Sequence, residues 1–127
     1  MMSSLERFLN ERDGVVPDDL VLNTLQSYGH NVEVVADMQH EYKYQRDGIA
    51  YIAPTQKYHT ALCDSMAGAW FDVVALVGNI GNANSQLIMT APKIKYDPEH
   101  GFVAEFLIAI LRPDFSEEAR IKAKRLS

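Results

Sequence analysis

The segment from Lys93 to Arg112 constrains the fold of this chain more than any other. It reads as two strands around a turn at residues 97–101, and the second strand, Phe102–Leu111, carries one charge, Glu105. A strand with one face in water alternates apolar and polar residues, whereas a strand that is apolar on both faces needs cover on both. That cover comes from the chain's own helices or from a second subunit. The strand therefore points to association as the leading theme.

The composition is that of an ordinary globular protein of one domain. The chain has 127 residues, of which 47% are apolar and 23% are charged. The formal net charge of -5 argues against a nucleic-acid partner, which requires a basic surface. A single cysteine, Cys63, excludes an internal disulfide and every zinc motif with several cysteines.

No targeting or membrane segment is recognisable in the sequence. The first ten residues lack the basic start and the apolar stretch of a signal peptide. No window approaches the roughly 18 to 20 apolar residues that a membrane-spanning helix needs. We therefore expect a soluble cytoplasmic protein that binds neither membrane nor nucleic acid.

Two helices are expected in the first 29 residues. Ser3 and Glu6 form a capping-box pattern that predicts a short first helix. Pro17, followed by two aspartates, predicts the start of a second helix, because proline suits the first turn and acids suit its positive end. Gly29 is placed as its C-terminal cap. The residues expected on the buried side of this second helix are Leu20, Val21, Leu25 and Tyr28.

The period changes to that of strands between Val32 and Ala53. Apolar residues alternate first from Val32 to Ala36, and then Tyr42 and Tyr44 alternate with polar neighbours. The Arg46-Asp47-Gly48 sequence predicts a tight hairpin turn, because Asp-Gly readily adopts positive φ angles. The return strand ends at Pro54.

Residues 55–84 leave two interpretations open. Apolar residues recur at spacings of three and four from Tyr58 to Ile80, which indicates one long amphipathic helix. Alternatively, Tyr58–Cys63 is a third strand and the helix begins near Ser65. In both cases the helix ends within residues 78–84, where glycines and asparagines cluster.

The remaining elements are a strand, a turn, the apolar strand and a terminal helix. The first of these strands covers residues 86–96 and contains Pro92, which places it at a sheet edge or at a bulge. Pro113 ends the last strand, and Ser116 opens the terminal helix, with acids at its start and bases at its end. The whole chain, residues 1–127, thus reads as a single α+β domain with the order α-β-β-(β)-α-β-β-α.

No group of residues predicts an active site. His59 and Cys63 would need an orienting base, an oxyanion hole and a cleft, and Cys63 is better explained as a small core residue. The four histidines lack metal-ligand spacing. Gly78 and Gly81 close a helix, whereas the glycines of a phosphate loop open one. We therefore predict no catalytic residue, no metal and no cofactor.

The candidate functional residues are those of an interface. Adjacent aromatic residues on one helix cannot both face the same core, so either Trp70 or Phe71 is a candidate surface contact. One face of the last strand supplies the others. The complete candidate set is Trp70, Phe71, Val103, Glu105, Leu107, Ala109 and Leu111.

The order of elements resembles that of the class I type III secretion chaperones and of the related YbjN-like bacterial proteins. The local similarity is carried by residues 41–51, which look like the family's second hairpin, and by residues 77–84, which look like the asparagine-bearing end of its central helix. Residues 93–107 look like its last hairpin. This resemblance implies a twisted antiparallel sheet of about five strands packed by helices, and a homodimer. It also implies binding of an extended partner segment in apolar grooves without a cofactor.

Two functional hypotheses follow from the sequence. The first is a non-enzymatic, dimeric protein-binding module that resembles a secretion chaperone or a YbjN-like adaptor. The second is a small ligand-binding or enzymatic α+β domain with a site between the sheet and the central helix. Its polar groups would be Tyr42, Tyr44, His59 and Asp64. A structural or anti-defence protein of a phage stays open as a third class, which no feature of the sequence favours.

Overall fold

A computed structural model of the chain describes residues 14–46, 48–81 and 85–112. The expected helix near Ser3 and the expected terminal helix after Ser116 lie outside these residues. The elements within them are β1 (Gly14–Val15), α2 (Asp18–Ser27), β2 (Asn31–Val35), β3 (Glu41–Arg46), β4 (Ile49–Pro54), β5 (Gln56–His59), α3 (Met66–Ile80), β6 (Gln86–Thr90), β7 (Lys93–Asp97) and β8 (Gly101–Leu111). The predicted α+β class is confirmed.

Helix α2 follows the predicted start and end signals. It begins directly after Pro17, and its first turn carries the two aspartates. At its end the N–H groups of Gly29 and His30 donate to the carbonyls of Gln26 and Leu25, with Gly29 at φ +86°. This arrangement satisfies carbonyl groups that the last helical turn leaves free.

The buried side of α2 is shorter than the sequence suggested. Val21 and Leu25 are fully buried, and Leu20 packs against them. The prediction for Tyr28 is wrong, because this residue caps the helix beyond its last turn and its side chain is 67% exposed.

The second interpretation of residues 55–84, a strand followed by a helix, is correct, but the strand begins two residues earlier and ends four residues earlier than the predicted Tyr58–Cys63. Gln56–His59 forms β5, and α3 begins after Ser65, whose Oγ accepts a hydrogen bond of 2.9 Å from the N–H of Gly68. The apolar spacing of three and four therefore extends beyond the helix by coincidence. Pairing with β8 satisfies the backbone of β5, and this contact is remote in sequence.

Strand β8 lies in the middle of the main sheet and has partners on both edges. β5 pairs with one edge, and β6 and β7 pair one after the other with the second edge. Beyond β6 and β7 lie β2 and β1, respectively. β3 and β4 form a separate two-stranded hairpin, as the Asp47-Gly48 turn predicted.

Pro92 lies at a bulge rather than at a sheet edge. Met89 is opposite Ile108 and Lys93 is opposite Glu105, so a step of four residues on one strand faces a step of three on β8. The hydroxyl of Thr90 accepts a hydrogen bond of 3.0 Å from the N–H of Leu107 here. This bond replaces a backbone contact that the interrupted ladder does not provide.

The sheet differs from the expected one in two respects. The described residues contain eight strands rather than about five, partly because the bulge at Pro92 and the bend near Thr55 each divide a longer strand. The sheet is also mixed rather than antiparallel, since β2 pairs with β6 in parallel. A long connection through β3, β4, β5 and α3 makes this parallel pairing possible.

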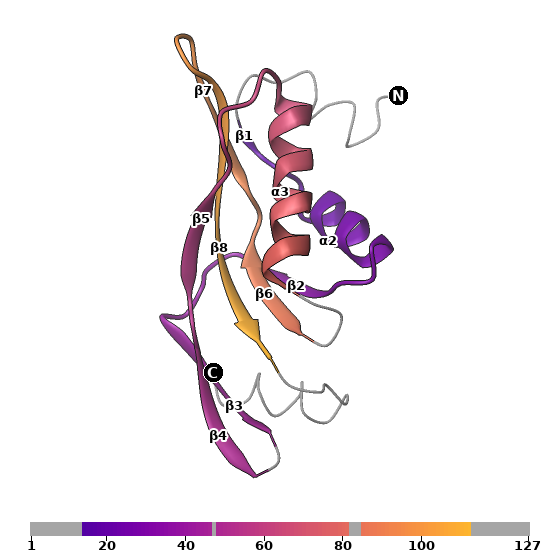
Figure 1. Cartoon of the computed structure of the whole chain (residues 1–127), viewed down its shortest axis with the longest axis vertical. Coiled ribbons are helices and arrows are strands. Elements are labelled where there is room, and N and C mark those ends of the chain that lie inside the picture. Colours follow the sequence, from indigo (N-terminus) through magenta and orange to yellow (C-terminus); the bar gives the residue numbers. More distant parts are fainter. Residues whose placement is uncertain (1–13, 47, 82–84, 113–127) are drawn as a thin grey trace.

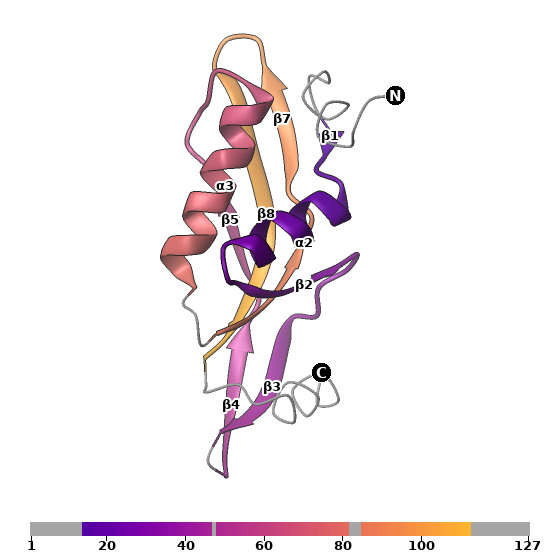
Figure 2. The same ribbon diagram turned by 90° about the vertical axis from the view of Figure 1, so that its right-hand side faces the viewer.

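Both helices pack on the same face of the main sheet (Figures 1 and 2). We call this the helix face and the opposite one the open face. The core of the helix face contains Val21 and Leu25 of α2 and Trp70, Val73 and Val77 of α3. Against them lie side chains of the sheet, namely Val32, Leu87, Met89, Ile94, Ala104, Phe106 and Ile108.

Candidate functional site

The side chains of β8 alternate between two different environments. Ala104, Phe106 and Ile108 are buried in the core of the helix face. The intervening residues, Val103, Glu105, Leu107, Ala109 and Leu111, therefore project to the open face. These five residues are the strand residues of the predicted interface, and the open face divides them into two groups.

At the hairpin end of the open face, the chain provides its own cover. Ala109 and Leu111 are fully buried and share a second core cluster with Tyr42, Tyr44 and Ala53 of the hairpin. Tyr44 and Tyr51 stack with their ring centroids 5.5 Å apart. Part of the cover that the apolar strand required thus comes from β3 and β4, rather than from a helix or a second subunit.

At the turn end of the open face, next to the turn at residues 97–101, β8 is less well covered. Val103, Glu105 and Leu107 are half-buried. Figure 1 shows both helices on the other side of the sheet and the hairpin at its opposite end, so no described helix lies over these three residues. This end is the part of the predicted interface that remains accessible.

Charged side chains surround Glu105 at the turn end. Its carboxylate lies 2.8 Å from the ammonium group of Lys95 and 3.4 Å from that of Lys57. Lys93 is directly opposite Glu105 in the register, on the same face. The hydrogen bond from Lys95 is the main reason that the pKa of Glu105 lies below its ordinary value, and partial burial opposes this shift.

Lysines are concentrated at this end of the open face. Of the four lysines in the described residues, Lys57, Lys93 and Lys95 lie here and Lys43 lies on the hairpin. His59 is paired with Glu105 in the register and shares the same face. Lys57, Lys93 and Lys95 thus outnumber the carboxylates of Glu105 and Asp97 at the turn end, although the whole chain has a formal net charge of -5.

A groove with a volume of about 550 Å³ opens beside these lysines. Leu62, which is 56% exposed, forms one side, and Val103 of β8 contributes to its lining. The remaining lining residues are Lys95, Tyr96, Asp97, Pro98 and Gly101. The groove offers an apolar surface next to charged groups of both signs.

The turn that closes this groove is held by Asp97. Its Oδ1 accepts a hydrogen bond of 2.8 Å from the N–H of Glu99, and its Oδ2 lies 2.9 Å from Nδ1 of His100. The contact with His100 is the main cause of the lowered pKa of Asp97. At Gly101, with φ +100°, an added Cβ would lie 2.5 Å from the carbonyl oxygen of Cys63. The backbone at residue 101 therefore lies too close to the backbone of Cys63 for a side chain.

The environment of Cys63 disfavours a nucleophilic role. Its thiol donates to the carboxylate of Asp72 at 3.1 Å and approaches the carbonyl oxygen of Ala61 at 3.3 Å. Burial, together with the nearby Asp72 carboxylate, raises the pKa of Cys63 to about 11. His59 Nδ1 lies 3.1 Å from the carbonyl oxygen of Thr60. At neutral pH the thiol is protonated, whereas a nucleophile requires the thiolate.

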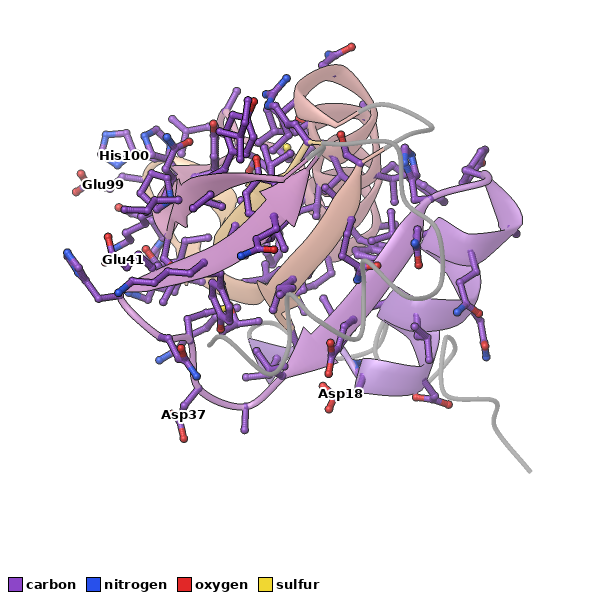
Figure 3. The ribbon with its side chains drawn as sticks, turned by 90° about the horizontal axis from the view of Figure 1, so that it is seen from below. Asp18, Asp37, Glu41, Glu99 and His100 are labelled. Carbon is purple, nitrogen blue, oxygen red and sulfur yellow. The ribbon has the colours of Figure 1, made fainter. Side chains whose placement is uncertain are left out.

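The described residues do not form a metal centre. They contain no group of three or more histidine, cysteine, aspartate or glutamate side chains that could hold a metal ion. Figure 3 shows Asp18, Asp37 and Glu99 at separate places on the outside of the molecule, with His100 near Glu99.

The polar groups of the alternative ligand site lie apart from one another. Tyr42 and Tyr44 belong to the core cluster of the open face, on the opposite side of the sheet from α3. His59 and Asp64 are exposed, on β5 and in the loop before α3. The space between α3 and the sheet is occupied by fully buried side chains, among them Trp70, Val73 and Ile108.

The predicted division between the two adjacent aromatic residues is clear in the structure. Trp70 is 1% exposed and belongs to the core, whereas Phe71 is 60% exposed on the outside of α3. Sequence reasoning missed Lys57, Lys93, Lys95 and Leu62 as parts of the candidate site. The spacing of Lys93 and Lys95 indicated that both lie on one face of their strand. The contact between Lys57 and Glu105 could not be found in this way, because it depends on the register between β5 and β8.

Within the described residues, no helix is long and apolar enough to cross a membrane. Comparison with protein-family models, with curated proteins and with solved structures finds no match to this chain.

Proposed function

We propose that this protein is a non-enzymatic protein-binding module that holds a segment of another polypeptide against the turn end of the open face. The observation that carries this proposal is the contrast along β8. Its open face is closed by the hairpin at Ala109 and Leu111, but it remains accessible at Val103 and Leu107. The adjacent groove can receive a bulky apolar side chain, as peptide-binding grooves commonly do.

The resemblance to secretion chaperones and YbjN-like adaptors supports the same proposal at the level of the fold. The finer architecture that it implies, a twisted sheet with helices before, between and after the strands, belongs to this proposal as well. Because a fold does not determine a function, the accessible groove and the exposed Leu62 carry more weight.

The family resemblance also implies a homodimer, and we propose that its interface does not include the turn end. Two copies that met directly through the turn ends would bring Lys57, Lys93 and Lys95 of one copy near those of the other. Like charges in such an interface oppose association. We therefore assign the turn end to a foreign segment, and any dimer to another surface.

The test uses two residues that are equally exposed but lie on different surfaces. Leu62 lines the groove and is 56% exposed, whereas Ile52 is 57% exposed on the outer side of the hairpin. Peptides are selected from a random display library with the wild-type protein and then measured against Leu62→Asn and Ile52→Asn. We expect the selected peptides to lose at least about tenfold in affinity with Leu62→Asn, which corresponds to 1.4 kcal/mol, and to bind Ile52→Asn normally.

Light scattering of the wild type and of both variants accompanies the selection. A failure to select any peptide, or selected peptides that bind Leu62→Asn as well as the wild type, would contradict the proposal. A wild-type dimer that becomes monomeric in Leu62→Asn would assign this face to a second copy and would contradict the proposal too.

A further inference from the structure

We infer that the segment bound at the turn end is an acidic, extended peptide. Its carboxylates would pair with Lys57, Lys93 and Lys95, and one apolar side chain would enter the groove between Leu62 and Val103. This inference rests on the proposed function and adds the chemistry of the partner to it.

The balance of charges is the first argument. Lys57 and Lys95 share a single carboxylate, that of Glu105, and no ion pair joins Lys93 to another described residue. The three lysines thus outnumber the two carboxylates of this surface, those of Glu105 and Asp97, on an otherwise acidic chain. Much of the acidic character lies elsewhere, for example at Asp18 and Asp19 of α2. An acidic segment would complement this face.

The spacing of the lysines is the second argument. Lys57 lies on β5 and the other two lie on β7, so the lysines flank β8 on both sides. Lys93 and Lys95 are two residues apart, which is about 7 Å along a strand. In an extended peptide, side chains on one side recur at the same distance. The geometry therefore fits two acids separated by one residue, next to a bulky apolar residue.

Lysines on an exposed sheet also discourage unwanted pairing with other strands. That role alone is satisfied by charges spread over the surface. Here Lys95 lines a groove that also contains apolar residues, and Lys57 and Lys93 lie farther along the same face, opposite Leu107 and Glu105. Leu62 of the groove is 56% exposed. The combination of apolar floor and basic rim is the composition of a specific binding surface.

Nucleic acid is the competing polyanion. Three lysines are a small number for phosphate binding, and the carboxylates of Glu105 and Asp97 lie within the same surface. The observations therefore favour a peptide, and nucleic acid becomes an outcome of the test.

The experiment measures fluorescence anisotropy with four labelled probes on the full chain. Three are twelve-residue peptides with two copies of the repeat Xaa-Ser-Xaa-Ser-Leu-Ser, in which Xaa is glutamate, glutamine or lysine, so that Xaa and leucine project to the same side of an extended chain. The fourth probe is a single-stranded RNA of twelve nucleotides. We expect the glutamate peptide to bind best, with an affinity that falls as salt concentration rises. The double variant Lys93→Glu/Lys95→Glu should weaken it by about tenfold or more, which is 1.4 kcal/mol.

Two further variants sharpen the measurement. Lys43→Glu reverses one charge, where the double variant reverses two, at an exposed lysine on the hairpin outside the site, and it should leave binding unchanged. Glu105→Gln removes the carboxylate that Lys57 and Lys95 share, so the glutamate peptide should bind more tightly. Circular dichroism of each variant verifies the fold, which substitutions at exposed lysines should preserve.

The outcomes separate the chemistry of the partner from the proposed function. If the glutamine peptide binds as well as the glutamate peptide and Leu62→Asn weakens both, the acidic partner is wrong while protein binding stands. Equal weakening by Lys43→Glu, or preferred binding of the RNA, would also overturn the acidic peptide. If none of the peptides binds and the display selection yields nothing, the proposed function itself fails.

Discussion

The two ends of the open face show how one strand can serve stability and recognition at once. Leu107 and Leu111 lie on the same strand and the same face, four residues apart. Leu111 is fully buried under the hairpin, whereas Leu107 is half-buried and flanked by Lys57. The difference between them arises from what packs on the strand, because the two side chains are identical.

This comparison corrects a common inference from sequence. A strand that is apolar on both faces indicates that both need cover, and the expected sources were helices or a second subunit. In this chain a hairpin formed by residues 41–54 covers one end of the second face. On this face, three of the five strand residues that the sequence suggested, Val103, Glu105 and Leu107, therefore remain for a partner.

The largest expected effect comes from truncating these two leucines. Leu111→Ala should lower the free energy of unfolding by about 2–5 kcal/mol, since it removes a fully buried side chain and leaves a cavity. Leu107→Ala should cost less than about 1.5 kcal/mol, because water already reaches the side chain. Urea unfolding followed by circular dichroism measures both values.

Tyr44→Phe serves as a control for the cover, because it keeps the ring that packs on Leu111 and removes a hydroxyl that accepts a hydrogen bond of 3.4 Å from the N–H of Arg112. It should cost about 1 kcal/mol at most. If Leu107→Ala and Leu111→Ala lowered the free energy of unfolding equally, the two ends of the open face would be equally covered. That result would contradict the difference described above.

Signals that act over a few residues predicted the elements well. Pro17 and Gly29 mark the ends of α2, Asp47-Gly48 marks the hairpin turn, and Pro92 marks the bulge. Each works through a single residue: proline fixes its own φ and lacks an N–H group, whereas glycine readily adopts a positive φ.

Contacts between distant segments could not be predicted in this way. The parallel pairing of β2 with β6 and the pairing of β5 with β8 join segments far apart in the chain. The candidate site depends on them, because Lys57 reaches Glu105 through the second pairing. Periodicity identifies the buried side of an element, but it does not identify the element that covers it.

Substitutions of two glycines compare how tightly the backbone is packed at the turn end and at the hairpin end. Gly101→Ala should destabilise the protein by about 3 kcal/mol, since φ is +100° and the new Cβ would lie 2.5 Å from the carbonyl oxygen of Cys63. Gly48→Ala at the hairpin tip should cost about 1 kcal/mol, because φ is +78° but no atom lies within 4 Å of the added Cβ. Thermal unfolding of both variants measures the difference.

Peptide binding gives the same pair of variants a second use. Gly101 lines the groove, so Gly101→Ala should also weaken the selected peptides, whereas Gly48→Ala should not. A tolerated Gly101→Ala with normal stability would show that the chain does not pass closely at Cys63, and that the groove has another shape.

The smallest expected effect concerns Glu105, the acid among the lysines. Its folded-state pKa is lowered, so its contribution to stability is present above its ordinary pKa of 4.5 and is lost as the pH falls through the folded-state value. Glu105→Gln should therefore lower the free energy of unfolding by less than about 1 kcal/mol at pH 7, and by a smaller amount at pH 3. Urea unfolding at both pH values measures this difference.

A variant that is more stable than the wild type at pH 7 would mean that the free-energy cost of desolvating the Glu105 carboxylate exceeds the stabilisation from its contacts with Lys57 and Lys95. In that case Glu105 does not stabilise the turn end, although Lys57 and Lys95 contact its carboxylate.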